Sequence, residues 1–295
     1  MSKVECLTSN RPRVGHIRFF NCLPLYHGLV QNQVLRDVDL TQGTPAELNR
    51  LLLAGKLDIS PISSIAYARH QQDLLLMPNL SVSCAGPVKS IYLVSKRPIE
   101  ELDRRRVALT NTSATSHVLL KIILADAYGV QPRYFEAPPD LGLMLTEADA
   151  ALLIGDAALQ VHFAKPAGCY TYDLGVEWAK LTQRKMVFAV WAIRRAYAAE
   201  QPALVREVYR AWVRAMTYGV EHVADIAREA AREASFDADF LADYFTTLQF
   251  GLEDAHCRGL MEYYRRAGVR GHLDRVPSLD FLEGCTGGFM AENAG

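Results

Sequence analysis

Residues 107–128 read VALTNTSATSHVLLKIILADAY, and this stretch decides the class of fold. Its first part, Val107–Thr110, is a short apolar run typical of a strand. Its last part, 116–128, has apolar residues at helical spacing and ends before Gly129, a common helix stop. A polar turn lies between the two parts. A strand, a polar turn and a helix in this order form the unit from which α/β folds are built.

The same alternation of strands and helices continues on both sides of this unit. Further strands are expected over residues 13–17, 39–41, 57–60, 91–95, 134–135, 150–154 and 186–193. A helix is expected between Thr44 and Gly55, since Pro45 and Glu47 suit the first and third positions of a capped helix. Other helices are expected over 63–67, 203–227, 237–250 and 252–267. The regular alternation favours parallel sheets covered by helices on both faces.

The order of these elements predicts two lobes. A charged stretch at 96–106 interrupts the pattern of strands and helices, which then begins again. We therefore expect the chain to cross a hinge into a second lobe at this stretch and to return at the strand 186–193. The expected first lobe combines residues 11–96 with 194–295, which include a C-terminal helical tail, and the expected second lobe is 97–193.

The composition excludes several classes of protein. Half of the 295 residues are hydrophobic and 22% are charged, which is enough apolar material for a well-filled core. The chain has 32 basic and 33 acidic residues, so it has no surplus of positive charge with which to bind nucleic acid. No apolar run approaches the length of about 18 residues needed for membrane insertion. The first ten residues lack the apolar segment of a secretory signal, so we expect a cytoplasmic protein.

Motifs for metals, cofactors and common catalytic centres are missing from the sequence. The six cysteines are scattered without a C-x-x-C pair, which favours reduced thiols over a zinc or redox site. No G-x-G-x-x-G, G-x-x-x-x-G-K-[ST], G-x-S-x-G or H-E-x-x-H pattern occurs. These absences disfavour a zinc site, nicotinamide or flavin binding, and the common nucleotide and hydrolase functions, so hydroxyl and amide side chains are the candidates for chemistry.

The polar turn after the strand 107–110 is a candidate anion site. It offers four hydroxyls within five residues, from Thr112, Ser113, Thr115 and Ser116. The free N–H groups and the dipole of the following helix add partial positive charge at the same place, which suits a carboxylate. Capping of the helix by Thr115 or Ser116 is the alternative, although a cap needs only one hydroxyl.

A related arrangement occurs in the expected first lobe, where the segment Ser60-Pro61-Ile62-Ser63-Ser64 also follows a strand and opens a helix. Helix capping explains this segment about as well as ligand contact by Ser63 does. Two helix starts that face one cleft would suit a molecule with two carboxylates.

Two further segments place polar side chains next to strands. Asn21 lies between the strand 13–17 and Pro24, at a sheet edge where open α/β sheets bind ligands, but it could equally be a turn residue. Ser90 opens the strand 91–95 after the rigid turn Gly86-Pro87. His16 is interpreted as a structural residue of its strand, and Lys89 as a solvated lysine.

Gly155 and Asp156 follow the apolar strand 150–154. An aspartate at the end of a buried strand is often a functional residue in α/β folds. Asp156 could equally be the N-cap of the helix that follows it.

Taken in chain order, the motifs resemble the chorismate dehydratases, which begin the futalosine route to menaquinone. The resemblance covers about residues 13–195 and continues weakly in the tail. The motifs are Gly15-x-Ile17, Asn21-x-x-Pro24-Leu25, Gly55-x-Leu57-Asp58, Gly86-Pro87-Val88-x-Ser90, Ser113-x-Thr115-Ser116, Ile154-Gly155-Asp156-x-Ala158 and Val187-Phe188-Ala189-Val190-Trp191. The resemblance implies a type II periplasmic-binding-protein-like α/β fold, which agrees with two crossings of a hinge.

It also implies a small-molecule substrate, chorismate, which loses water to give 3-[(1-carboxyvinyl)oxy]benzoate without a cofactor. Asn21 and Ser90 would then contact the reacting part of the substrate. Carboxylate and other substrate contacts would come from Ser63, Ser113, Thr115, Ser116, Gly155 and Asp156. The catalytic base stays open, and the enolpyruvyl carboxylate of the substrate is one candidate.

Two other functions remain open at this point. The sister enzyme of the same pathway, which makes 1,4-dihydroxy-6-naphthoate, shares the fold, and a non-catalytic binding protein for small carboxylates would need a similar cleft. The segments Asn21–Pro24 and Gly86–Ser90 favour the dehydratase. The oligomeric state does not follow from the sequence.

Overall fold

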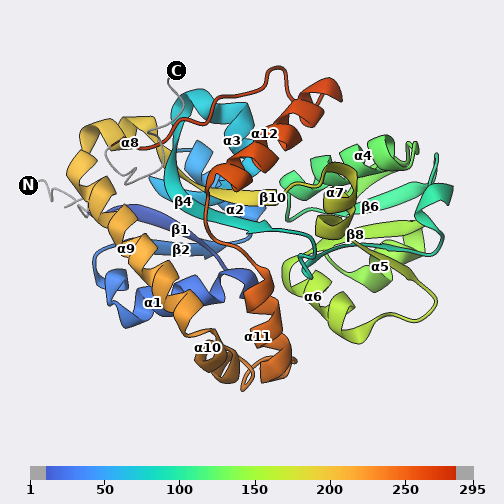
Figure 1. The fold of residues 1–295 in the computed structure, drawn as a ribbon, viewed down its shortest axis with the longest axis horizontal. Helices are drawn as coiled ribbons and strands as arrows, with labels where there is room; N and C mark the ends of the chain where they lie inside the picture. The colour runs from blue at the N-terminus through green and yellow to red at the C-terminus, as the bar shows by residue number, and fades with distance from the viewer. Residues whose placement is uncertain (1–10, 284–295) are drawn as a thin grey trace, which may run out of the picture.

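The computed structural model describes residues 11–283, which form two lobes that lie side by side (Figure 1). Each lobe is built around a five-stranded sheet. The first sheet has the order β2-β1-β3-β10-β4, with bounds β1 (Arg13–Ile17), β2 (Asp39–Gly43), β3 (Ile59–Ser63), β4 (Leu74–Cys84) and β10 (Met186–Arg194). The second has the order β7-β6-β8-β5-β9, with bounds β5 (Ile91–Ser95), β6 (Arg106–Thr110), β7 (Arg133–Ala137), β8 (Ala150–Ile154) and β9 (Tyr170–Asp173).

Both sheets are mixed, whereas the sequence predicts parallel sheets. The strands β1, β2 and β3 are parallel, as are β6, β7 and β8. In contrast, β10 runs antiparallel to β3 and β4, and β5 runs antiparallel to β8 and β9. The physical reason is the route of the chain. Strands β5 and β10 each enter their sheet directly from the opposite lobe and not through a helical crossover within their own lobe.

The chain crosses between the lobes twice, as expected, but each crossing comes one strand earlier in the chain than the predicted boundary. Strand β5 belongs to the second sheet, so the chain leaves the first lobe between Cys84 and Ile91 and not at 96–106. Strand β10 belongs to the first sheet, so the return lies between Thr182 and Met186. The expected boundaries at 96/97 and 193/194 therefore each leave one strand in the wrong sheet.

The helices lie on both sides of the sheets, and a short 3-10 helix, η1 (Phe20–Cys22), precedes the first of them. The predicted capping box of α2 is present, with the Thr44 side chain accepting from Glu47 N–H at 3.3 Å. The expected helix 203–227 is divided in two at His222. The bounds are α1 (Leu23–Gln31), α2 (Pro45–Leu53), α3 (Ser64–His70), α4 (Thr115–Ala127), α5 (Leu141–Glu147), α6 (Gly155–Ala164), α7 (Leu174–Thr182), α8 (Arg195–Glu200), α9 (Pro202–Glu221), α10 (Val223–Ala230), α11 (Ala238–Thr247) and α12 (Asp254–Val269).

Strand β4 is the main element that the sequence analysis misses. Its sequence, LLLMPNLSVSC, contains Pro78 and Asn79, which mark turns in most contexts. The strand tolerates them because it lies at the edge of the sheet, where a missing N–H donor costs little. Asn79 has a φ of 58°, and the pairing of β4 with β10 shifts register beside it.

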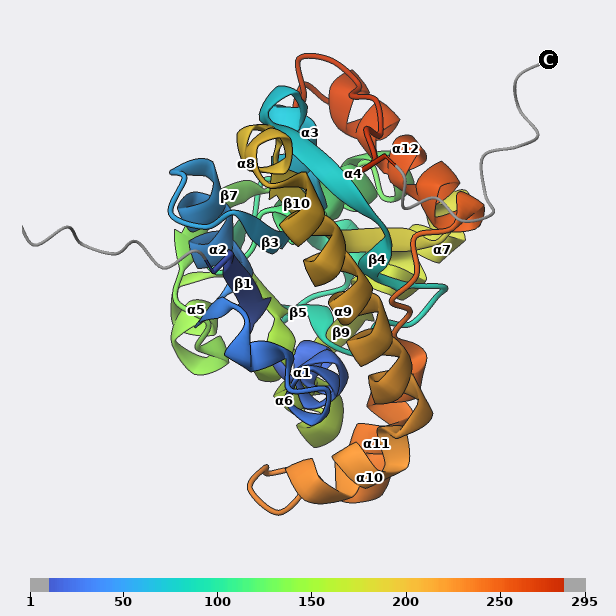
Figure 2. The same ribbon diagram turned by 90° about the vertical axis from the view of Figure 1, so that its left-hand side faces the viewer.

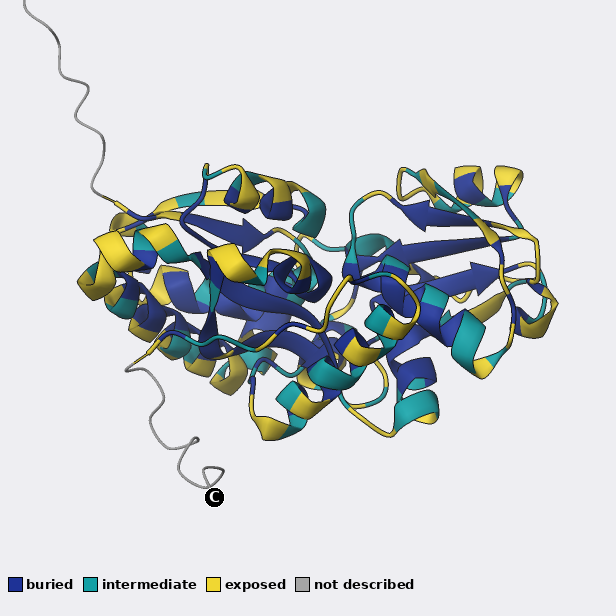
Figure 3. Ribbon diagram, turned by 90° about the horizontal axis from the view of Figure 1, so that it is seen from above, coloured by how far each residue is buried: buried dark blue, intermediate teal, exposed yellow. Residues whose placement is uncertain are grey.

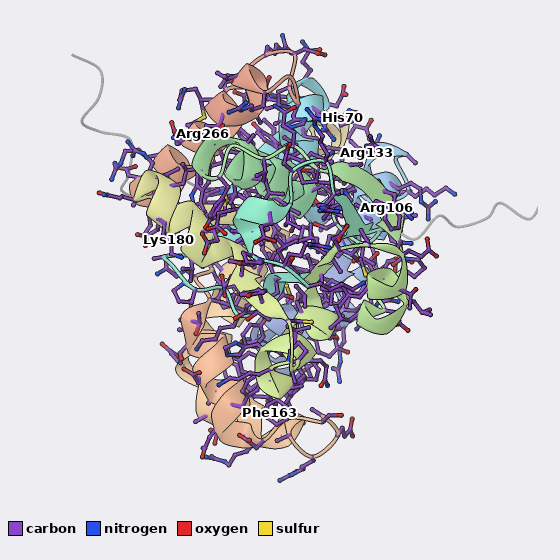
Figure 4. The ribbon with its side chains drawn as sticks, turned by 90° about the vertical axis from the view of Figure 1, so that its right-hand side faces the viewer. His70, Arg106, Arg133, Phe163, Lys180 and Arg266 are labelled. Carbon is purple, nitrogen blue, oxygen red and sulfur yellow. The ribbon has the colours of Figure 1, made fainter. Side chains whose placement is uncertain are left out.

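The helical tail contacts both lobes. Helix α12 packs against β10 and α3 of the first lobe and against α4 of the second (Figure 1). Arg266 of α12, labelled in Figure 4, forms an ion pair of 2.5 Å with Asp126 of α4. On the other side, Phe163 of α6 meets Phe240 of α11 edge to face with ring centroids 5.0 Å apart. The tail therefore joins the lobes at two places.

The buried strands lie inside both lobes, and the exposed residues lie on helices and loops (Figure 3). One hydrophobic core extends from β1, β3 and β10 into α4 and α7 of the second lobe. A smaller core covers the opposite face of the second sheet, beside α5 and α6. Within residues 11–283, Cys22, Cys84, Cys169 and Cys257 are all free thiols, as expected. Cys6, Cys285 and the first ten residues, on which the expected location of the protein rests, lie outside the described residues.

None of the described helices has both the length and the apolar character that a membrane crossing requires.

The long helix α9 lies against α1 (Figure 2), and glycines set the distance between the two helices. A Cβ atom on Gly28 would lie 1.9 Å from the backbone oxygen of Ala215, and one on Gly219 would lie 2.3 Å from that of Pro24. Because the obstacles are backbone atoms, a side chain at either position would push the helices apart.

Gly28→Ala and Gly219→Ala are each expected to lower the free energy of unfolding by at least about 2 kcal/mol, although alanine is the better helix former. Urea unfolding measures the effect. Gly142→Ala in the exposed first turn of α5 is the matched control, where the new Cβ makes only an ordinary contact of 3.4 Å. Equal stabilities of the three variants would contradict this account of the helix packing.

Candidate functional site

A cavity lies between the two lobes and encloses about 500 Å³ of space, including the part that is open to solvent. Its walls come from both sheets and from the first of the two crossings between them. The sequence analysis names eight site residues, and seven of them line this cavity: Asn21, Ser63, Ser90, Ser113, Thr115, Ser116 and Gly155. Asp156 does not line it.

The lining is neutral. Among the described residues around the cavity, none is Asp, Glu, Lys, Arg or His. The polar groups are five hydroxyls and the amide of Asn21, and the remaining walls are mostly aliphatic or aromatic. Such walls exclude water and strengthen hydrogen bonds to a bound anion. The apolar members, which the sequence analysis does not identify, are Ile17, Phe19, Pro45, Val82, Val88, Ile91, Ile154, Phe188, Ala189 and Leu248.

Asn21 reaches the cavity from η1, directly after β1. Its Oδ1 atom is buried and has no hydrogen-bond partner within residues 11–283. A buried amide oxygen without a partner costs free energy unless a ligand or water satisfies it. This observation favours a ligand contact over the interpretation of Asn21 as a turn residue.

Ser63 is fixed by a residue that the sequence analysis misses. The buried Asn49 of α2 donates from Nδ2 to Ser63 Oγ at 3.0 Å, and its Oδ1 accepts from Ser63 N–H at 2.9 Å. Because Ser63 Oγ accepts this bond, its own proton is available to an acceptor in the cavity.

Ser90 lies in the first crossing, where β5 begins. Its Oγ donates to the carbonyl oxygen of Val88 at 3.3 Å, and the buried Tyr244 of α11 lies beside it. Burial raises the pKa of Tyr244, so its hydroxyl stays protonated. The sequence offers no signal for this tyrosine because it comes from the tail, more than a hundred residues away.

The loop before Ser90 is held by Asp173. Its buried carboxylate accepts from Val88 N–H at 3.1 Å and from Lys89 N–H at 2.8 Å. Burial raises the pKa of Asp173, and these backbone donors oppose that shift. The Lys89 side chain pairs with Asp243 at 2.7 Å and is only 16% exposed, so its interpretation as a solvated lysine is wrong.

In the turn before α4, some of the hydroxyl groups are hydrogen-bonded to one another. Ser113 Oγ donates to Ser116 Oγ at 3.0 Å and accepts from Ser116 N–H at 3.4 Å. Thr112 Oγ1 lies 2.8 Å from Thr110 Oγ1 and does not line the cavity. The Ser116 hydroxyl accepts from Ser113, so its own proton can point to an anion at the start of α4.

Thr115 connects the two lobes. Its Oγ1 accepts from Ile65 N–H at 3.3 Å and lies 3.3 Å from Ser64 Oγ. Since Ser64 Oγ donates to Val187 O at 2.9 Å, Thr115 supplies the proton of the contact with Ser64. The starts of α3 and α4 therefore face each other, as the sequence suggests, but this hydroxyl is shared between them.

Asp156 also connects the lobes, because its Oδ1 accepts from Phe20 N–H at 3.0 Å. Burial raises the pKa of Asp156. Gly155 adopts a φ of 59°, in the left-handed region that favours glycine. Neither helix capping nor a direct ligand contact, the two alternatives from sequence, describes the bond that Asp156 makes.

His16 is buried and 3% exposed, and burial lowers its pKa to about 4. It does not line the cavity, in agreement with its interpretation as structural. Over residues 11–283, no three His, Cys, Asp or Glu side chains are grouped so that they could hold a metal ion.

Comparisons with known proteins place this geometry in context. A family model described as menaquinone biosynthesis matches residues 12–268. A chorismate dehydratase of Thermus thermophilus is 35% identical over 274 residues, which cover 88% of this chain and 96% of the relative. A 1,4-dihydroxy-6-naphtoate synthase of the same organism is 25% identical over 203 residues, which cover 67% of this chain and 69% of the relative.

Among solved structures, the periplasmic aliphatic sulphonate binding protein of Escherichia coli superposes with a TM-score of 0.62 at 16% identity. The alignment covers 91% of this chain and 90% of that one. The predicted two-lobed periplasmic-binding-protein-like fold is therefore confirmed.

Thr115→Val is expected to lower the free energy of unfolding by about 1–3 kcal/mol, because it leaves the buried Ile65 N–H without an acceptor. Thr115→Ser keeps the hydroxyl and is expected to cost less than half as much. Urea unfolding of the two variants measures the difference. A loss in Thr115→Val no larger than that in Thr115→Ser would show that the hydroxyl contributes no more than the methyl group, and would contradict this role of the hydrogen bond.

Proposed function

The chain belongs to the menaquinone-biosynthesis family, and on this premise we propose that it is a chorismate dehydratase, a hydro-lyase acting in the cytoplasm. The observation that carries the proposal is the neutral, hydroxyl-lined cavity between the lobes, in a chain that is 35% identical to a chorismate dehydratase over most of its length. The product would be 3-[(1-carboxyvinyl)oxy]benzoate, and no cofactor is needed.

The reaction breaks two bonds from ring carbons to their substituents, one C–H bond and one C–O bond. A base takes the proton from the carbon that bears the enolpyruvyl ether, and the electron pair spreads through the diene towards the ring carboxylate. The pair then forms the last double bond of the aromatic ring as hydroxide leaves the neighbouring carbon. The proton and the hydroxide together make one water. A protein helps most by holding the two carboxylates and by stabilising the charge that develops on one of them.

The lining suits this task. A carboxylate can be held by the free protons of Ser63 and Ser116 and by the N–H groups at the start of α4. Neutral donors leave the ring carboxylate able to accept more charge as the proton departs, whereas a tight ion pair would stabilise the ground state as well. Thr115 would help by keeping α4 beside α3.

Asn21 and Ser90 are proposed as the catalytic contacts. The Asn21 amide combines a donor with an acceptor that lacks a protein partner, so it can orient the leaving hydroxyl. The Ser90 hydroxyl enters the cavity from the other lobe, and by exchanging its long bond to Val88 O it can donate to developing negative charge.

The base is proposed to come from the substrate. No Asp, Glu, His or Lys is among the described residues that line the cavity. The enolpyruvyl carboxylate lies close to the departing proton within the same molecule, and a folded conformation in the cavity would bring the two together. It could then pass the proton to the leaving hydroxide.

The main alternative is synthesis of 1,4-dihydroxy-6-naphthoate, because a relative with that name also matches the chain. That match is lower in identity and shorter than the match to the dehydratase. A non-catalytic small-carboxylate binding protein is the second alternative, since the fold also serves sulphonate binding.

Incubation of the pure protein with chorismate tests the proposal. We expect loss of the diene absorbance together with formation of 3-[(1-carboxyvinyl)oxy]benzoate, identified by mass and by its aromatic spectrum. Decay no faster than in a protein-free control would contradict the proposal, and binding without turnover would favour a carboxylate-binding protein.

Asn21→Ala and Ser90→Ala are each expected to lower kcat for chorismate by at least about tenfold, the effect of one lost contact to developing charge. Asn32→Ala and Ser95→Ala are matched controls. Asn32 ends α1 and bonds Gly28 O, and Ser95 lies at the other end of β5. Rates near that of the wild type in the two site variants would remove these residues from the catalytic machinery.

A further inference from the structure

The two residues that begin α6, Gly155 and Asp156, lie against η1 of the opposite lobe. Gly155 is part of the cavity wall, whereas Asp156 does not line the cavity. It joins the segment that carries Asn21 to the segment that carries Ser90.

The helix that carries Asn21 lacks a cap of its own. Its N-cap residue is Phe19, whose side chain cannot accept a hydrogen bond from the first turn. The orphan N–H of Phe20 instead donates to Asp156 Oδ1 at 3.0 Å, across 136 positions of sequence. The second lobe therefore supplies the acceptor that Ser, Thr, Asp or Asn supplies within most helices.

The neighbouring Gly155 also contacts the segment that carries Asn21. A Cβ atom on Gly155 would lie 2.7 Å from the ring of Phe19, so the ring packs directly on the glycine. The Gly155 N–H donates to Ser90 O at 2.9 Å. One turn of the second lobe thus holds the backbone of both proposed catalytic residues, Asn21 through its helix start and Ser90 directly.

We propose that Asp156 is a positioning residue that caps the Asn21 helix from the opposite lobe, so that Asn21 is correctly placed only when the lobes are closed. This inference rests on the proposed function for its kinetic consequence, but not for the hydrogen bond itself. It replaces the substrate contact that the sequence suggests for Asp156 with an indirect role. Closure would then order the catalytic amide as well as enclose the substrate.

Two substitutions separate this role from direct chemistry. Asp156→Ala removes the acceptor and is expected to lower kcat for chorismate about tenfold, on the scale of one lost cap. Asp156→Asn keeps an amide oxygen at the same place and is expected to stay within about threefold of the wild type. If kcat of Asp156→Asn is as low as that of Asp156→Ala, the carboxylate itself takes part in the chemistry and the proposal is overturned.

Asp140→Ala is the matched control for loss of a cap. Asp140 caps α5 of the same lobe by accepting from Leu143 N–H at 3.0 Å, and it lies outside the cavity. Its loss is expected to lower the melting temperature without changing kcat. A fall in kcat equal to that of Asp156→Ala would show that any lost cap slows the protein, and would overturn the specific role.

The two residues should also be coupled. If Asp156 acts only through Asn21, the double variant Asp156→Ala/Asn21→Ala is expected to be no slower than Asn21→Ala alone. Independent effects, in which the double variant loses the product of the two single factors, would contradict action through Asn21.

Hydrogen exchange gives a readout that needs no turnover. The Phe20 amide is expected to exchange at least about tenfold faster in Asp156→Ala than in the wild type or in Asp156→Asn. Unchanged exchange in the Ala variant overturns the cap, whatever the enzyme does with chorismate. If wild type fails to turn over chorismate while the exchange result holds, the proposed function fails and the structural role of Asp156 stands.

Discussion

In each lobe, one inner strand of the sheet is reached by a crossing from the other lobe. The rest of the structure depends on this constraint. Strand β5 enters the second sheet from the first lobe, and β10 enters the first sheet from the second. Both lie inside their sheets with two neighbours each, so neither lobe can complete its sheet without the crossing. The first crossing also supplies part of the cavity wall, through Val88 and Ser90, and β10 supplies Phe188. The hinge and the site are therefore parts of one feature.

The cavity is neutral because the charged side chains near it are bonded to other groups of the protein. Asp173 is satisfied by backbone donors, and Lys89 by Asp243, so neither faces the ligand space. Burial makes an unpaired charge costly, which favours a lining of hydroxyls and amides when the ligand itself carries the charge. A doubly acidic molecule would bring all of the formal charge into such a site. The protein would stabilise that charge with hydroxyl protons and with the dipoles of backbone N–H groups.

Contacts between the lobes link this lining to closure. Thr115 bonds the start of α3, Asp156 bonds the start of η1, and Phe163 meets the aromatic side chains of α11. The tail helices support two of these contacts, because α12 packs on α3 and α4 and α11 carries Phe240. Opening the lobes would break buried hydrogen bonds and separate apolar rings, so ligand exchange must offset these losses.

The sequence by itself determined many of the local elements, the presence of two lobes and the polar part of the cavity lining. Strong caps such as Thr44 with Glu47, and polar turns directly after apolar strands, act over a few residues and can be recognised without the fold. Asn21, Ser90 and the turn 113–116 lie in such segments, which is why their shared edge could be predicted. Only the tertiary structure decided the strand directions, the exact crossings, and the roles of Asn49, Tyr244 and Asp156. These depend on partners from 14 to 154 positions away, or on the opposite lobe, and no local propensity encodes contacts at such separations.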